Sequence, residues 1–289
     1  MKKNILVLGS LFLTICAFHS CKEVGPNIVL KPNYNAAFDT SYVESPVQVA
    51  ELKNVVIEEF TGVKCSNCPA GHQIIAVLKT ANPNRIVSIS MHPKNGLGLP
   101  YSGNPDLRND KVQDLMTNYF SYPGFEPIAS IDRQLFPLES NILLDKNKWT
   151  SFTNQEIVLT TPVNLMLNTS YDSATNELTI VTELHYTKNV NEENKLTIVL
   201  TESNVVAAQL DGSTVIDLYE HKDVLRDFIT DNRGDAVPMP HDAGRVIIKI
   251  YKTTLNAAWK PENMKVAAYV HEGSATSKIV YQGKEVDVE

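Results

Sequence analysis

Two cysteines stand between a strand pattern and a helix pattern, and this arrangement limits the possible folds more than any other feature. Residues 54–60 (NVVIEEF) are rich in β-branched side chains and predict a strand. Cys65 and Cys68 follow, and residues 69–80 show one apolar stripe after a first-turn proline, which predicts a helix. The pattern continues in order with a strand at 85–91, a helix at 110–120 and a strand at 128–132. This alternation predicts an α/β domain over residues 53–154.

The pattern changes near residue 155, where strand-like segments alternate with turn residues. Six such segments are found, at 163–171, 177–186, 195–201, 245–251, 265–271 and 278–288. A helical insertion is expected from about His221 to Thr230. Six strands with one insertion predict an Ig-like β-sandwich over residues 155–289.

The N-terminus has the pattern of a secretory signal, with two lysines followed by an apolar run at residues 5–18. This run is too short to span a bilayer, which takes about 20 residues. Ser20 and Cys21 at its end resemble a bacterial lipobox, so we expect a signal peptide at 1–20 and a lipid on Cys21. The alternative is an ordinary signal peptide with an incidental cysteine. Residues 21–52, rich in proline and asparagine, are expected to form a tether.

Charge and cysteine content narrow the functional classes. The 289 residues include 26 Lys and Arg against 33 Asp and Glu, a net charge of −7 with no basic block, which argues against nucleic-acid binding. Of the four cysteines, Cys16 would leave with the signal peptide and Cys21 would carry the lipid. Only Cys65 and Cys68 then remain, in an oxidising compartment.

Three interpretations of the cysteine pair stay open. The pair can be redox-active, because a helix N-terminus stabilises a thiolate and the second cysteine can close a disulfide. It can be an inert disulfide in a binding module. It can also bind zinc, although structural zinc takes four ligands and only His72 and His92 are near in sequence.

Three segments carry a family resemblance: residues 59–71 (EFTGVKCSNCPAG), residues 88–92 (SISMH) and the later His221-x-x-Val-Leu-Arg at 221–226. The first resembles the strand, turn and active-site helix of the thioredoxin superfamily. Together they resemble the Bacteroidota outer-membrane lipoproteins related to the twenty-eight-kilodalton outer-membrane protein. The resemblance implies a thioredoxin-like domain at 53–154 followed by a β-rich domain, and it implies no established activity.

The resemblance assigns roles to three residues around the cysteines. Glu59, six residues before Cys65, would be the acid that moves the resolving thiol's proton; alternatively it faces solvent, since Glu58 adjoins it and only one can point inward. Pro127 would be the cis-proline opposite the pair; alternatively it is an ordinary trans proline. Lys64 replaces the thioredoxin tryptophan and would favour a Cys65 thiolate.

Two histidines are second-tier candidates. His72 lies one helical turn after Cys68 and could tune its pKa, or it could be a half-exposed surface residue. His92 ends a strand at the carboxyl edge of the sheet, where ligand sites of α/β folds gather.

These observations predict a cell-envelope lipoprotein of the outer membrane, on either its periplasmic or its outer face. The leading function is thiol–disulfide exchange with envelope or secreted proteins, with Cys65 attacking and Cys68 resolving. The alternative is a non-enzymatic lipoprotein that binds a partner through its β-domain. No cofactor and no metal is expected, and the membrane is reached through the N-terminal lipid alone.

Overall fold

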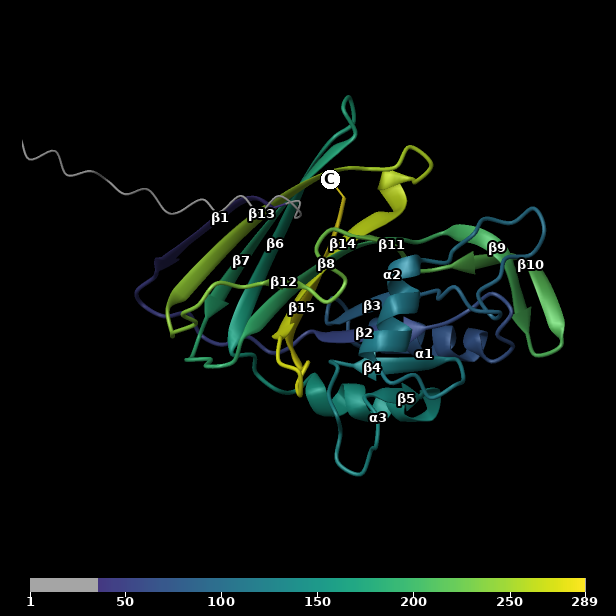
Figure 1. Ribbon diagram of the computed structural model, residues 1–289, viewed down its shortest axis with the longest axis horizontal. Coiled ribbons are helices and arrows are strands. Elements are labelled where there is room, and N and C mark those ends of the chain that lie inside the picture. The colour runs from purple at the N-terminus through teal and green to yellow at the C-terminus, as the bar shows by residue number, and fades with distance from the viewer. Residues whose placement is uncertain (1–35, 289) are drawn as a thin grey trace, which may run out of the picture.

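The computed structural model describes residues 36–288, in which strands far outnumber helices (Figure 1). The expected signal peptide and Cys21 lie outside the described residues and stay predictions. Over residues 36–288 no helix is long and apolar enough to cross a lipid bilayer.

The first half has the predicted strand–helix alternation. Its elements are β2 (Val55–Phe60), α1 (Cys68–Ala81), β3 (Ile86–Met91), α2 (Asp110–Asp114, continued by a π-helical turn, Leu115–Tyr119) and β4 (Ile128–Ile131). Every residue of β2 and β3 is buried, as their β-branched composition favours. Two further elements, β5 (Leu143–Asp145) and α3 (Lys146–Glu156), were not predicted. The polar helix α3 is anchored by buried Trp149, whose indole N–H donates to the Leu144 carbonyl at 2.9 Å.

One nine-stranded sheet runs through both halves of the chain. Beside β3 it continues into β11 (Val224–Phe228), β8 (Asn194–Glu202), β14 (Met264–Glu272) and β15 (Val280–Asp287), with β12 (Asp235–Ala236) paired to β8, and on the other side of β3 it runs through β2 and β4 to β5. The halves join where β11 runs parallel to β3, and the Ser90 N–H donates to the Asp223 carbonyl at 2.8 Å. The expected boundary at residues 154/155 therefore does not coincide with the edge of a sheet. The division into two folding units stays a prediction for limited proteolysis.

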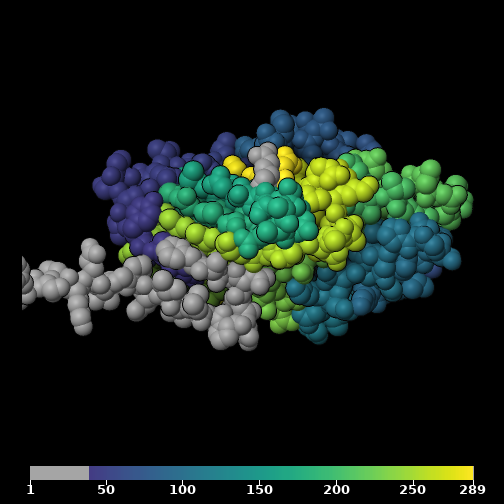
Figure 2. All heavy atoms as spheres, turned by 90° about the horizontal axis from the view of Figure 1, so that it is seen from above, coloured from purple at the N-terminus to yellow at the C-terminus, as the bar shows by residue number. Residues whose placement is uncertain are grey.

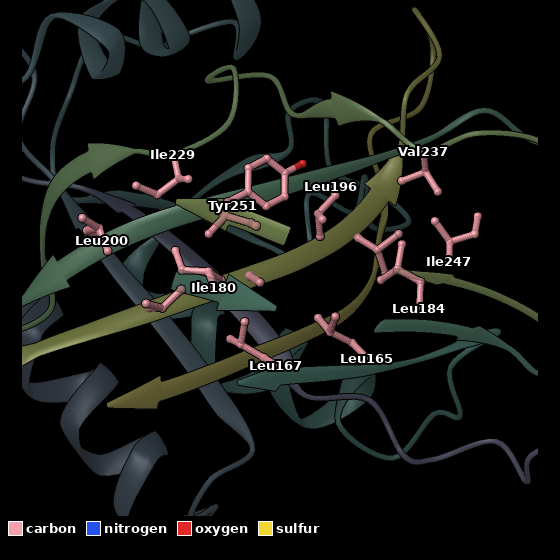
Figure 3. Packing of buried hydrophobic residues seen from close by; sticks show 14 of the residues in the cluster. Leu165, Leu167, Ile180, Leu184, Leu196, Leu200, Ile229, Val237, Ile247 and Tyr251 are labelled. Atoms are coloured by element: carbon pink, nitrogen blue, oxygen red, sulfur yellow. The ribbon is translucent and has the colours of Figure 1, made fainter. Parts of the chain in front are cut away.

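A second sheet covers one face of the C-terminal strands. It contains β1 (Ala36–Val43), β13 (Arg245–Thr254), β7 (Glu177–Tyr186) and β6 (Val163–Asp172) in that order. Leu165, Ile180 and Leu184 of this sheet share one buried cluster with Leu196 and Leu200 of β8 (Figure 3). Two sheets thus face each other across an apolar core, but one of them also belongs to the α/β half.

Two local expectations are wrong. The predicted helix at 221–230 is instead the end of one strand followed by β11, because β11 pairs with β8 on one side and β3 on the other. The expected tether includes β1, which pairs with β13 from Ala36 to Val43. In both places long-range strand pairing overrides a weak local pattern.

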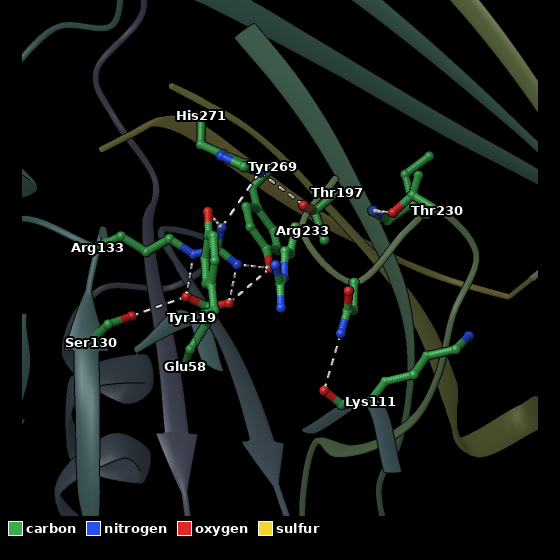
Figure 4. Close-up of polar contacts among 12 residues, drawn as sticks. Glu58, Lys111, Tyr119, Ser130, Arg133, Thr197, Thr230, Arg233, Tyr269 and His271 are labelled. Atoms are coloured by element: carbon green, nitrogen blue, oxygen red, sulfur yellow. Dashed lines mark hydrogen bonds and ion pairs between the residues drawn. The ribbon is translucent and has the colours of Figure 1, made fainter. Parts of the chain in front are cut away.

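A buried charge cluster ties the α/β strands to β14 (Figure 4). The Arg133 guanidinium bonds both carboxylate oxygens of Glu58, at 2.6 and 2.7 Å. The Tyr269 hydroxyl, from β14, donates to the same carboxylate at 2.8 Å, and Ser130 donates at 3.0 Å. Arg133 holds the pKa of Glu58 below its usual range against the opposing effect of burial. The carboxylate is therefore charged and fully hydrogen-bonded inside the protein.

Candidate functional site

The cysteine pair forms a disulfide at the start of α1. The Cα atoms of Cys65 and Cys68 are 5.4 Å apart, and Cys68 is the first helical residue. This confirms that the pair lies between a strand and a helix. Neither residue is open to solvent, since Cys65 is 3% exposed and Cys68 is 0% exposed. A redox partner cannot reach either sulfur in this conformation.

The hairpin of β9 (Val205–Asp211) and β10 (Thr214–His221) covers the disulfide loop. The backbone N–H of Leu210 donates to the Val63 carbonyl at 2.8 Å, and that of Gly212 to the Ser66 carbonyl at 2.9 Å. The Gln209 side-chain amide is buried and donates to the Cys65 carbonyl at 3.1 Å. Figures 1 and 2 place this green hairpin at one end of the molecule.

The other side of the disulfide loop is held by a backbone segment after β3. The Lys64 N–H donates to the Leu97 carbonyl at 2.8 Å. A side chain on Gly62 would meet the Leu97 backbone at 2.6 Å, so this close approach requires glycine. The Lys64 ammonium lies 5.3 Å from the centre of the Tyr101 ring. The loop is therefore enclosed by two segments far from it in sequence.

Glu59 lies inside the protein beside the first turns of α1. It is 0% exposed, and a side chain on Gly71 would stand 2.9 Å from its Oε1. Within residues 36–288 neither carboxylate oxygen has a well-formed hydrogen bond. Burial raises the pKa of Glu59 well above its usual range; the Ser90 hydroxyl opposes this, and the charge of Glu126 adds to it. Glu59 therefore keeps its proton far above the pH at which an exposed glutamate loses it.

The alternative that Glu59 faces solvent is wrong. β2 is an interior strand, with β3 on one side and β4 on the other. Both faces of β2 are covered, so Glu58 and Glu59 point in opposite directions and are both buried. Glu58 is paired with Arg133, whereas within residues 36–288 no lysine or arginine is paired with Glu59, and the nearest basic ring is that of His72 at 3.8 Å.

His72 is placed between Glu59 and the hairpin rather than on the open surface. Its side chain is 18% exposed, and its Nε2 lies 3.8 Å from Oε1 of Glu59. The same nitrogen contacts the Thr61 hydroxyl at 2.9 Å, and Nδ1 contacts the Tyr219 hydroxyl at 2.8 Å. Burial, together with His221, lowers the pKa of His72 to about 3, so the ring is neutral at physiological pH.

A pocket of about 200 Å³ opens beside these groups, between α1 and the end of the hairpin. His92 and His221 line it, with ring centres 5.9 Å apart. Both residues are buried. Among the described residues, both ring nitrogens of His92 and the Nε2 of His221 lack a hydrogen-bond partner. Burial lowers the pKa of His221 to about 4 and that of His92 further.

The sequence pointed to His72 and His92 but missed Gln209 and Tyr219 altogether. The hairpin carries a usable signal, because Asp211-Gly212 between two apolar runs is typical of a tight β-turn. The peptide bond before Pro127 is cis, as expected, and Pro127 directly precedes β4. For the zinc interpretation, residues 36–288 contain no group of three histidine, cysteine or acidic side chains placed to hold a metal.

Fold and site together define a β-rich protein with an enclosed cysteine pair between a central strand and a helix. Residues 113–288 match the outer membrane protein Omp28 family. The chain therefore belongs to the Omp28 family of outer membrane proteins, which places it in the cell envelope. The matched region includes the hairpin but begins after the cysteines, so it does not bear on their chemistry.

Solved structures show a related fold at low sequence identity. HBP35 of Porphyromonas gingivalis superposes with a TM-score of 0.63 at 20% identity, over 83% of this chain and 77% of that chain. A domain of the outer membrane lipoprotein Omp28 from Porphyromonas gingivalis matches at 14% identity, over 45% of this chain and 89% of that one, with a TM-score of 0.31. The search of curated proteins finds no significant match. At this identity the similarity to HBP35 speaks for the fold alone.

Proposed function

We propose that this protein exchanges thiols and disulfides with envelope proteins through a thioredoxin-like site at Cys65 and Cys68. The placement of Glu59 carries the proposal. A buried, proton-bearing carboxyl lies against the same helix turns that begin at Cys68. Such a group can give a proton to a leaving thiolate, and the helix N-terminus stabilises that thiolate while it forms.

The exchange begins with a partner thiolate attacking Sγ of Cys65. A sulfur–sulfur bond forms between partner and Cys65, and the electron pair of the old bond leaves on Cys68. Glu59 gives its proton to the Cys68 thiolate, so that the charge ends on the carboxylate. A second thiol on the partner then completes its oxidation and releases reduced Cys65. In the reverse sequence the Cys65 thiolate attacks a partner disulfide and Cys68 resolves the mixed disulfide, which reduces the partner; the reduction potential sets the direction.

Burial of the disulfide favours a second candidate function. Because both cysteines are buried and the hairpin bonds to their loop, the disulfide can instead be inert and hold the loop while another surface binds a partner. Exchange requires the hairpin to move away from the loop, whereas partner binding does not. The two candidates therefore predict different thiol reactivity.

Alkylation and exchange assays separate the candidates. In the reduced protein, exchange predicts that iodoacetamide modifies Cys65 well before Cys68, as read by peptide mass spectrometry. The Cys68→Ser variant should form a stable mixed disulfide with disulfide-scrambled ribonuclease, because the Cys65 thiolate attacks a ribonuclease disulfide and one ribonuclease sulfur leaves as a thiolate; the matched Cys65→Ser variant should form none. Equal slow alkylation, no mixed disulfide and a potential far below about −300 mV would establish the inert disulfide instead.

The membrane attachment belongs to the same proposal. We infer that Cys21 carries the lipid, because a short apolar run ends in Ser20 and Cys21. The intact mass of membrane-extracted protein should show loss of residues 1–20 and added acyl mass. A mature chain with an unmodified Cys21 would remove the anchor.

A further inference from the structure

We propose that His72 and Tyr219 carry protons between solvent and Glu59, a role that rests on the exchange function proposed above. The imidazole stands between the two groups. Its Nε2 lies 3.8 Å from Oε1 of Glu59 and bonds the Thr61 hydroxyl at 2.9 Å, so transfer to Glu59 requires this bond to give way, and its Nδ1 contacts the Tyr219 hydroxyl at 2.8 Å. The first gap exceeds hydrogen-bond length, and a small approach or one bridging water closes it.

The reaction creates the need for such a route. Once Glu59 has protonated the Cys68 thiolate, it is a carboxylate without a cation inside the protein. An unpaired buried charge is strongly disfavoured, so transfer of the proton to Cys68 is complete only when the carboxylate regains a proton, and resupply therefore affects the reduction itself. Glu59 itself is fully buried and has no direct contact with bulk solvent.

A neutral imidazole can pass this proton without holding a charge. His72 gives the proton on Nε2 to Glu59 while Nδ1 takes the proton of the Tyr219 hydroxyl. Tyr219, which is partly exposed, then takes one proton from water. One proton leaves the solvent, one arrives at Glu59, and neither His72 nor Tyr219 keeps a charge. His72 ends with its proton on Nδ1, and reoxidation of the cysteines runs the route backwards and restores the first tautomer. The low pKa of His72 suits this role, because a charged ring would be trapped.

The lysines that line the pocket are paired with carboxylates, so they add no unpaired charge beside the proton route. Lys79 lines the pocket, and its ammonium is paired with Asp223 at 2.9 Å and Glu285 at 3.3 Å. Lys222 is paired with Glu220 at the pocket rim. Glu126 also acts on Glu59, and burial raises its pKa too.

His92 and His221 complete the pocket with neutral rings. Among the described residues their ring nitrogens include three without a hydrogen-bond partner, and water in the pocket can bond such nitrogens. The pocket thus combines buried hydrogen-bonding groups with no uncompensated charge.

Removal of one hydroxyl tests the route. The Tyr219→Phe variant keeps the ring and loses the proton. Tyr171→Phe is the matched control, since Tyr171 bonds only Asn176 at 2.7 Å within the described residues and lies far from the site in the four-stranded sheet. The rate at which dithiothreitol reduces the Cys65–Cys68 disulfide is measured in the full protein. We expect Tyr219→Phe to slow reduction by a factor of about three or more, with a larger solvent deuterium isotope effect. The control should not change the rate.

If the Tyr219 hydroxyl has only a structural role, its removal should change the reduction rate in the opposite direction. If Tyr219 only holds the hairpin closed, its loss should expose the disulfide and speed reduction. Faster or unchanged reduction therefore overturns the proposal. The variant His72→Gln should slow reduction similarly, and the two changes together should not add, because both interrupt one route. Additive losses would also overturn it.

Dithiothreitol separates this proposal from the exchange function. The small reductant replaces the partner protein, so a slower Tyr219→Phe variant supports the route even if no envelope protein is a substrate. If the wild-type protein exchanges with partners and Tyr219→Phe has no effect, the route alone fails.

Discussion

Loss of Arg133 should be among the most destabilising single changes in the α/β half. Arg133→Met keeps an apolar stem of similar length but removes the guanidinium that bonds both oxygens of Glu58. The carboxylate would retain only the hydroxyls of Tyr269 and Ser130. It would then be a buried anion without a cation.

The magnitude follows from that burial. Arg133 and Glu58 are almost completely inaccessible, so water cannot replace the lost partner. Breaking a buried ion pair on one side costs about 3–5 kcal/mol. At about 2 °C per kcal/mol for a chain of this size, the melting temperature should fall by roughly 6–10 °C. Protonation of Glu58 relieves the charge, so the loss should be smaller at pH 5 than at pH 7.

Calorimetry of three variants tests this reasoning. The double variant Arg133→Met with Glu58→Gln removes both charges and keeps the hydrogen bonds of Tyr269, so it should recover at least half of the loss. Lys148→Met is the control, because its pair with Glu139 is half exposed and should change stability by about 1 kcal/mol or less. A double variant no more stable than Arg133→Met alone would refute an unpaired charge as the cause.

Two further predictions follow from the pocket and the helix beneath it. Burial lowers the pKa of His72 to about 3 and that of His221 to about 4. As the pH falls, the unfolded chain therefore takes up protons on these histidines at a higher pH than the folded protein does. Urea midpoints should therefore fall as the pH drops from about 6.5 to 4, and His221→Gln should flatten that slope. Gly71→Ala should destabilise by about 1–3 kcal/mol, because its methyl group would lie 2.9 Å from Glu59, and this outweighs the gain in helix propensity of about 1 kcal/mol. Gly96→Ala, with open space around it, should stay within about 1 kcal/mol in the same urea assay; a more stable Gly71→Ala would show that the carboxyl moves aside freely.

The local elements near the cysteines were predictable because their apolar period is undisturbed. Residues 69–80 form one stripe and indeed lie in α1, and the strand at 85–91 corresponds to β3. The strand–helix order also placed Cys68 at a helix start. These features depend on neighbours within a few residues, which is the range over which sequence periodicity is informative.

The sequence could not show how the site is enclosed. The alternation of Glu58 and Glu59 suggested one solvent face, because nothing local reveals that helices and strands cover both faces of β2. Gln209 bonds Cys65 from 144 residues away, and Tyr219 contacts His72 of α1 from 147 residues away. Such contacts depend on the joining of β11 to β3, and that pairing lies in a segment whose pattern favoured a helix.

Because the hairpin and the Leu97 segment enclose the disulfide, thiol reactivity measured in the α/β half alone would differ from that of the whole chain. A fragment of residues 53–154 would contain Cys65, Cys68 and Glu59 but lack the hairpin that covers them. Its disulfide loop would keep the Leu97 segment on one side but lose the hairpin on the other, and His72 would lose its contact with Tyr219. Fast chemistry in such a fragment would describe the fragment, because in the whole chain the hydrogen bonds from β9 must break first. The function of the pair therefore depends on the free energy of opening the β9–β10 hairpin as much as on the chemistry of the thiols.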